Sequence, residues 1–197
     1  MKFNSPQINF VLPKWITDFD YTKELIYPTL EDRMNLVIQL ARINAQPGRG
    51  GPFAAAVFEL ETGKLISPGV NLVVQENNSA LHAEVVALMM AQKSLKSYSF
   101  SLNGSGNFQI ATSTEPCAMC MGAIPWSGVR ELVCGSRDED ARAIGFEEGL
   151  KPAAWIKWYE ENGIKVIRDI LRAEATEVLK GYLVSGGVIY NGADGND

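Results

Sequence analysis

One histidine and two closely spaced cysteines constrain this chain of 197 residues more than any other feature. His82 is the only histidine, and it opens an apolar stretch, HAEVVALMM, with a helical pattern. Cys117 and Cys120 follow Pro116, a residue that suits the first turn of a helix because its missing N–H needs no partner there. Positions i and i+3 lie on one helix face, so the two sulfurs can hold one ion. We therefore expect His82, Cys117 and Cys120 to converge on a single metal ion.

The two segments together match a catalytic signature. HAE at 82–84 followed by PCAMC at 116–120 fits the pattern H-x-E…P-C-x-x-C of zinc deaminases. One neutral imidazole and two thiolates neutralise Zn²⁺, and three protein ligands leave a fourth position for water, as in catalytic zinc sites. Because such a neutral complex is a weak Lewis acid, the water needs a nearby base. Glu84, two residues from His82, is the expected proton shuttle of a site that holds one Zn²⁺ per chain.

The third cysteine, Cys134, leaves an alternative of a different class open. It could supply a fourth ligand and close a Cys₃His site, which would make the chain a structural zinc-binding module without catalysis. Cys134 lies in an apolar strand pattern, ELVCG, where a buried cysteine commonly behaves as a small hydrophobic residue. The zinc content and the turnover of a Cys134 variant would separate the two readings.

The pattern of elements along the chain indicates an α/β protein with a layered sheet. Hydrophobic residues make up 46% and charged residues 21%, enough for one substantial core. We expect an irregular N-terminal arm at 1–28, a deaminase domain at 29–185 and a Gly/Asn/Asp-rich tail at 186–197. Strands are expected at 53–60, 64–74, 107–113, 130–136 and 164–170, and helical segments at 29–45, 82–95, 115–126, 138–144, 152–162 and 173–184. Strands that alternate with helices are typical of this class.

Charge and composition exclude several kinds of partner. The net charge of −5, from 18 basic and 23 acidic residues, disfavours nucleic acid, whose phosphates dominate its binding. The chain has no apolar run of the roughly 18 residues that a membrane span needs. Three cysteines do not form a disulfide framework, and the first residues lack a secretory pattern, so a cytoplasmic protein is expected.

Five motifs carry a resemblance to a known family: GGPFAAAV, PGVN, HAE, EPCAMCMGAIPW and GFEE. Over about residues 30–190 the chain resembles the cytidine deaminase-like superfamily, and within it the bacterial guanine deaminases. The resemblance implies a three-layer α/β/α fold with a five-stranded mixed sheet and a homodimer, with exchange of C-terminal segments as an option. It also implies a small nucleobase substrate, guanine first and ammeline-type triazines second. The tRNA adenosine deaminases and the cytosine deaminases share much of this pattern and remain alternatives.

The resemblance also assigns roles at the substrate. Phe53 in GGPF matches an aromatic residue that packs on the base, and Asn71 in PGVN matches an amide at the purine edge. Glu148 in GFEE matches a carboxyl group that contacts the substrate and can protonate the departing amine. The competing interpretations are a strand residue for Phe53, a turn residue for Asn71 and a solvated turn for Glu148.

Three further residues complete the expected site. The family places an aromatic residue matching Trp126 near the pocket wall, although core packing competes with that role. Tyr190 in the tail could close the pocket as part of a lid, from its own subunit or from a partner. The N–H of Ala83, at a helix start, is placed to hold a substrate carbonyl.

Overall fold

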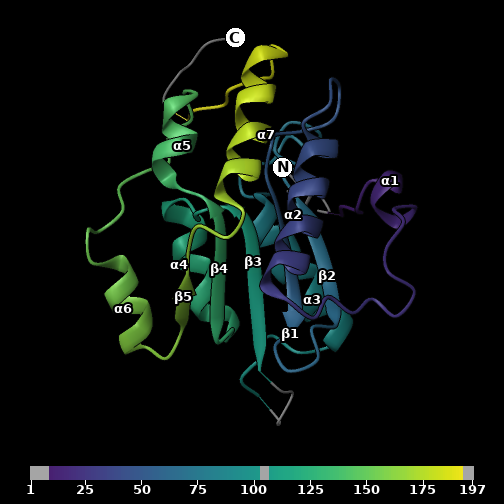
Figure 1. Cartoon of the computed structure of the whole chain (residues 1–197), viewed down its shortest axis with the longest axis vertical. Coiled ribbons are helices and arrows are strands. Elements are labelled where there is room, and N and C mark those ends of the chain that lie inside the picture. The colour runs from purple at the N-terminus through teal and green to yellow at the C-terminus, as the bar shows by residue number, and fades with distance from the viewer. Residues whose placement is uncertain (1–8, 103–106, 193–197) are drawn as a thin grey trace, which may run out of the picture.

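A five-stranded mixed sheet lies between two layers of helices (Figure 1), which confirms the predicted fold class. The computed structural model describes residues 9–102 and 107–192. The strand order is β2-β1-β3-β4-β5. β1 pairs antiparallel with β2 and β3, whereas β4 pairs parallel with β3 and β5. The strands are β1 (Ala54–Glu59), β2 (Leu65–Val70), β3 (Phe108–Thr114), β4 (Glu131–Ser136) and β5 (Lys165–Ile167).

The helices cover both faces of the sheet and divide its side chains between two cores. α2 (Leu30–Asn44) and α7 (Arg172–Val184) lie on one face, and α3 (Ala83–Leu95) and α4 (Ala118–Ser127) on the other (Figure 1). Along β1, Ala56 and Phe58 join the core that holds most of α2, while Ala55 and Val57 join the core beneath α3 and α4. This alternation is what a strand buried on both faces requires. The remaining helices are α1 (Lys14–Thr17), α5 (Asp138–Ala143) and α6 (Trp155–Glu161).

The direction of the strands places two helix starts at one edge of the sheet. β2 and β3 both run antiparallel to β1, so β2 and β3 point the same way and end at the same edge. α3 follows β2 and α4 follows β3, and both helices therefore begin there. Gly69 in β2 lets α3 approach closely, because a Cβ at this position would lie 2.4 Å from the Ala83 carbonyl oxygen and from the Ala87 nitrogen. The residues at the two helix starts are thereby brought together.

Several predicted bounds differ from the structure. The strand expected at 64–74 ends at Val70, and the strand expected at 164–170 is only Lys165–Ile167. The N-terminal arm is not wholly irregular, because it contains α1 and an antiparallel bridge between Ile26 and Lys64. Burial of Ile16 in the core below α2 explains why this part of the arm is ordered. No helix within the described residues combines the length and apolar character that crossing a bilayer requires.

The predicted start of α2 is confirmed. The Thr29 hydroxyl accepts a hydrogen bond from the Asp32 backbone N–H at 3.0 Å, and the Asp32 carboxylate accepts one from the Thr29 N–H at 3.2 Å. This reciprocal capping box satisfies two backbone donors that have no partner inside the helix. The position of α2 matters for function because its last residue, Asn44, lies beside the loops of the candidate site.

Candidate metal centre and active site

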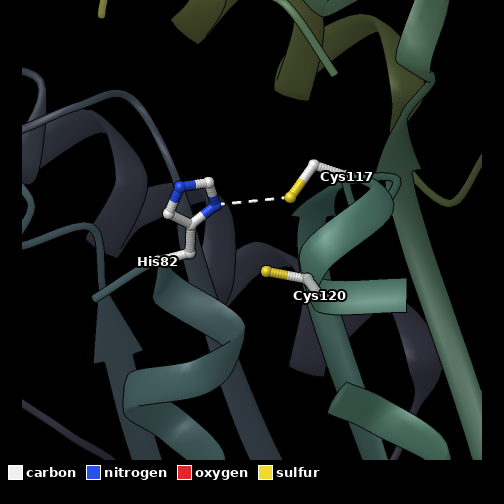
Figure 2. A group of neighbouring side chains, drawn as sticks. All are labelled: His82, Cys117 and Cys120. Carbon is white, nitrogen blue, oxygen red and sulfur yellow. Dashed lines mark hydrogen bonds between the residues drawn. The ribbon is translucent and has the colours of Figure 1, made fainter. Parts of the chain in front are cut away.

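The three predicted metal ligands converge at the two helix starts. His82 is the N-cap of α3, Cys117 is the N-cap of α4, and Cys120 lies one turn further along α4. Their side chains point toward one another across the gap between the helices (Figure 2). The Sγ of Cys117 lies 3.4 Å from the Nδ1 of His82, and the three ligand atoms all lie within 4.8 Å of one another.

This geometry fits a zinc ion. Tetrahedral Zn²⁺ with Zn–S bonds of about 2.3 Å and Zn–N bonds of about 2.0 Å separates its ligand atoms by roughly 3.5 to 3.8 Å. The 3.4 Å between Cys117 and His82 is close to that range, so little movement is needed to bind the ion. One imidazole and two sulfurs are also a donor set that suits zinc.

The two sulfurs act as a coupled pair. A hydrogen bond from Cys120 lowers the pKa of Cys117 to about 4, against the effect of burial, and His82 adds to the shift. The same hydrogen bond, together with burial, raises the pKa of Cys120. One thiolate is therefore already favoured at neutral pH, and the pair retains one proton that a bound metal ion would displace.

Cys134 is not part of this group. It is fully buried in β4, within the core beneath α3 and α4, and burial raises the pKa of its thiol. Among the described residues the cluster of possible metal ligands contains His82, Cys117 and Cys120 without Cys134. The structure thus contradicts the alternative of a closed Cys₃His site.

A small cavity of about 100 Å³ adjoins the metal ligands. The buried carboxyl groups of Glu84 and Glu148 both lie on its wall. Burial raises the pKa of Glu84 to about 7 and that of Glu148 to about 8, and the charge on Cys117 adds to both shifts. The other lining residues are Phe53, His82, Thr112, Thr114, Glu115, Cys117, Phe146, Glu147, Tyr190, Asn191 and Gly192. Two carboxyl groups that ionise near neutral pH are thus placed beside a metal site, an arrangement suited to proton transfer.

The acidic pair of GFEE is divided between two environments. Glu148 is 6% exposed, and its backbone carbonyl accepts a hydrogen bond of 2.9 Å from the N–H of Ala118 at the start of α4. Glu147 is exposed, and its carboxylate accepts a hydrogen bond from Arg142 at 2.9 Å. The alternative of a solvated turn therefore describes Glu147. Glu148 is instead buried, and its backbone is hydrogen-bonded to the start of α4.

Phe53 and Tyr190 also reach the cavity. The Phe53 ring packs edge-on against Phe146, with 4.8 Å between the ring centroids. Next to Tyr190, the Asn191 amide accepts from the Glu147 N–H at 2.8 Å and donates to the Gly145 carbonyl at 3.0 Å. These two hydrogen bonds tie the C-terminal segment of this chain to the GFEE loop. The rest of the predicted tail, residues 193–197, lies outside the described residues.

Three predicted substrate residues do not line this cavity. Trp126 is 86% exposed and borders a separate apolar hollow of about 700 Å³ between α4 and α6. Ala83 lies between two lining residues and is fully buried. Asn71 lies behind the wall, where its N–H donates to the Phe53 carbonyl at 3.1 Å.

Sequence reasoning missed other residues on the cavity wall: Thr112, Thr114, Glu115, Phe146 and Asn191. Two of them had a local signal, because Phe146 stands within GFEE and Glu115 directly precedes the PCAMC segment. The two threonines read as ordinary strand residues. Asn191 reaches the site through a contact across 44 residues of sequence, which no local pattern indicates.

Comparison with known proteins decides the family. The model of the cytidine and deoxycytidylate deaminase zinc-binding region matches residues 28–136, more than half of the chain. The chain belongs to this deaminase family. As a member, it is a zinc-dependent aminohydrolase, and the match covers all three metal ligands and Glu84.

Among relatives of this deaminase, guanine deaminases are prominent. Guanine deaminase of Bacillus subtilis is 33% identical over 120 residues, which cover 61% of this chain and 72% of the relative. The structure of guanine deaminase from Nitrosomonas europaea is 41% identical, covers 93% of this chain and 100% of that chain, and has a TM-score of 0.83. The structure of NE0047 in complex with 2,6-diaminopurine is 43% identical, covers 93% and 96%, and has a TM-score of 0.86.

Single cysteine substitutions should distinguish an open zinc site from a closed one. We expect Cys134→Ala to retain one Zn²⁺ per chain and Cys117→Ala to lose most of it, because Cys117 faces His82 whereas Cys134 is buried in the core away from the ligand cluster. Zinc measured by inductively coupled plasma mass spectrometry on the purified proteins checks this. Equal zinc loss in the two variants, with both still folded by circular dichroism, would contradict the assignment of the ligands.

Proposed function

We propose that this deaminase hydrolyses guanine to xanthine and ammonia. One observation carries the proposal: the metal ligands His82 and Cys117 line the same small cavity as two buried carboxyl groups, those of Glu84 and Glu148. Replacement of an amino group by oxygen needs a nucleophile, a base to activate it and an acid for the leaving nitrogen. The cavity offers a candidate for each role.

The size of the cavity suits a single heterocyclic base. At about 100 Å³ it is much smaller than the roughly 300 to 1,000 Å³ of sites for drug-sized ligands. The similarity to guanine deaminases and to NE0047, whose structure contains an aminopurine, supports the same assignment. Aminated triazines such as ammeline have a similar edge and are expected as secondary substrates.

Each residue of the candidate site has its own role in the proposed reaction. Zinc held by His82, Cys117 and Cys120 would supply the Lewis-acid chemistry that makes water a nucleophile at neutral pH. Glu84 takes a proton from the attacking water and delivers it to the adjacent ring nitrogen, a role that its buried place on the cavity wall beside His82 supports. A new C–O bond forms at the amino-bearing carbon, and Glu148 gives its proton to the departing amino group, so that the C–N bond breaks and ammonia leaves. The remaining proton of the new hydroxyl group returns to Glu148 as the carbonyl of xanthine forms.

Other residues bind and orient the base in this proposal. Phe53 packs on the ring, the amide of Asn71 recognises the purine edge, and the N–H of Ala83 holds the substrate carbonyl. Asn71 and Ala83 are both next to residues that line the cavity: the Asn71 N–H donates to the Phe53 carbonyl, and Ala83 lies between His82 and Glu84. Tyr190 closes the cavity from the C-terminal segment, which we propose as a lid.

A tRNA adenosine deaminase is the second candidate. The relative from Buchnera aphidicola subsp. Schizaphis graminum with that activity is 31% identical over 149 residues, which cover 90% of its length. The acidic balance of this chain, with a net charge of −5, disfavours RNA as a partner. We therefore retain guanine as the substrate. A cytoplasmic location is a separate part of the proposal.

A panel of substrates tests the proposal. Ammonia release is measured with guanine, ammeline, cytosine, adenine and a tRNA anticodon stem, each at the same protein concentration. We expect the highest kcat/KM with guanine and no inosine formation in the RNA. Turnover of the anticodon stem with none of the free bases would reverse the order of the two candidates.

The two buried carboxyl groups should have separable effects. We expect Glu84→Gln to lower kcat by roughly 10² to 10⁴-fold because the amide cannot accept a proton. Glu148→Gln should lower kcat less, since it removes only the acid for the leaving amine. Both variants should keep one Zn²⁺ per chain. Normal turnover in Glu84→Gln would remove the proposed shuttle.

We further propose that the chain forms a homodimer through the surface of α4 and α6. Trp126 and Trp158 are 86% and 51% exposed there, and they border the apolar hollow between these helices. Exposed apolar patches of this kind mark protein interfaces. Light scattering should give twice the chain mass of 21.6 kDa, and Trp126→Glu should shift it to that of one chain. A wild-type mass of one chain across the micromolar range would contradict the dimer.

A further inference from the structure

Asn44, the last residue of α2, joins the two loops that flank the candidate site. Its side chain is fully buried, and its Nδ2 group donates to the Gly51 carbonyl at 2.8 Å and to the Asn71 carbonyl at 2.9 Å. The backbone carbonyl of Asn44 accepts a third hydrogen bond, from the Gly50 N–H at 2.8 Å. One buried residue thus connects a helix end, the GGPF segment and the segment that carries Asn71.

The amide of Asn44 has only one suitable orientation. Both facing groups, the carbonyls of Gly51 and Asn71, are acceptors, so the nitrogen must point toward them. Its own Oδ1 is buried and has no hydrogen-bond partner within the part of the chain that the structure describes. A buried acceptor without a partner is costly, and such an exception in a core calls for an explanation.

The surrounding glycine confirms how closely these groups fit together. A Cβ at Gly50 would lie 2.5 Å from both the Asn44 Nδ2 and the Asn71 carbonyl oxygen. Glycine at position 50 therefore leaves the space that the Asn44 amide needs. The first glycine of GGPF thus makes room for the hydrogen bonds that join Asn44 to Gly51 and Asn71, which we call the junction. It does not line the cavity.

The junction fixes Asn71 on two sides. The Asn71 N–H donates to the Phe53 carbonyl at 3.1 Å, and the Asn71 carbonyl accepts from Asn44. The Asn71 Oδ1 in turn accepts from the Val73 N–H at 3.3 Å. Asn44 is therefore linked by one hydrogen bond to Asn71 and, through the Asn71 N–H, by a second one to Phe53.

We propose that Asn44 is a positioning residue, which sets the placement of Asn71 and Phe53 against the base without touching it. This inference rests on the proposed function for the roles of Asn71 and Phe53. It predicts that loss of the Asn44 amide weakens substrate binding and leaves the metal site intact. The reason is that the three metal ligands lie on α3 and α4, whereas the junction holds the loops before and after the β1–β2 hairpin.

The test compares Asn44→Ala and Asn44→Ser with Val37→Ala. Val37 is a fully buried residue of the same helix that packs in the core, away from the junction, and it controls for a general loss of stability. We expect the Asn44 variants to raise KM for guanine roughly tenfold to 100-fold, with a much smaller change in kcat and one Zn²⁺ per chain. Val37→Ala should leave KM within about twofold of the wild type, because it removes packing alone.

Hydrogen–deuterium exchange gives a second readout that needs no activity. The Asn44 variants should exchange faster than wild type at 50–53 and at 71–74, whereas Val37→Ala should not change these segments selectively. If wild type fails to deaminate guanine, the proposed function fails while the exchange result still tests the junction. Unchanged KM together with unchanged exchange in both Asn44 variants would overturn the inference.

Discussion

The meeting of two helix starts at one edge of the sheet is the constraint on which the rest of the structure depends. β2 and β3 end at this edge because both run antiparallel to β1, and α3 and α4 begin from them. The N-cap positions of the two helices carry His82 and Cys117, 35 residues apart in sequence and 3.4 Å apart in space. A change in the order or direction of these strands would separate the ligands and abolish the site.

The same arrangement explains the chemistry of the cavity beside the metal ligands. One imidazole and two thiolates would cancel the formal charge of Zn²⁺. Before an ion binds, burial raises the pKa of Glu84 to about 7 and that of Glu148 to about 8, and the charge on Cys117 adds to both shifts. Burial in one small cavity thus gives both carboxyl groups a pKa near neutral pH.

Local patterns in the sequence predicted the ligands and the fold class, whereas contacts across the chain defined the rest of the site. His82, Glu84 and the two cysteines could be predicted because they stand at short spacings at helix starts, where helical geometry places such residues on one face. Trp126 shows the limit of such patterns, because the sequence of an apolar helix does not indicate which of its faces lines the cavity. Asn44 and Asn191 show it too: each resembles an ordinary polar residue near the end of an element until the fold brings distant carbonyl and N–H groups to its amide.

The proposed chemistry depends on a zinc ion with three protein ligands and one open position. X-ray absorption at the zinc edge of the purified protein measures this coordination shell directly. We predict two sulfur ligands at about 2.3 Å, one imidazole nitrogen and one further light atom that belongs to no side chain. A shell with three sulfurs, or an active protein without zinc, would contradict it.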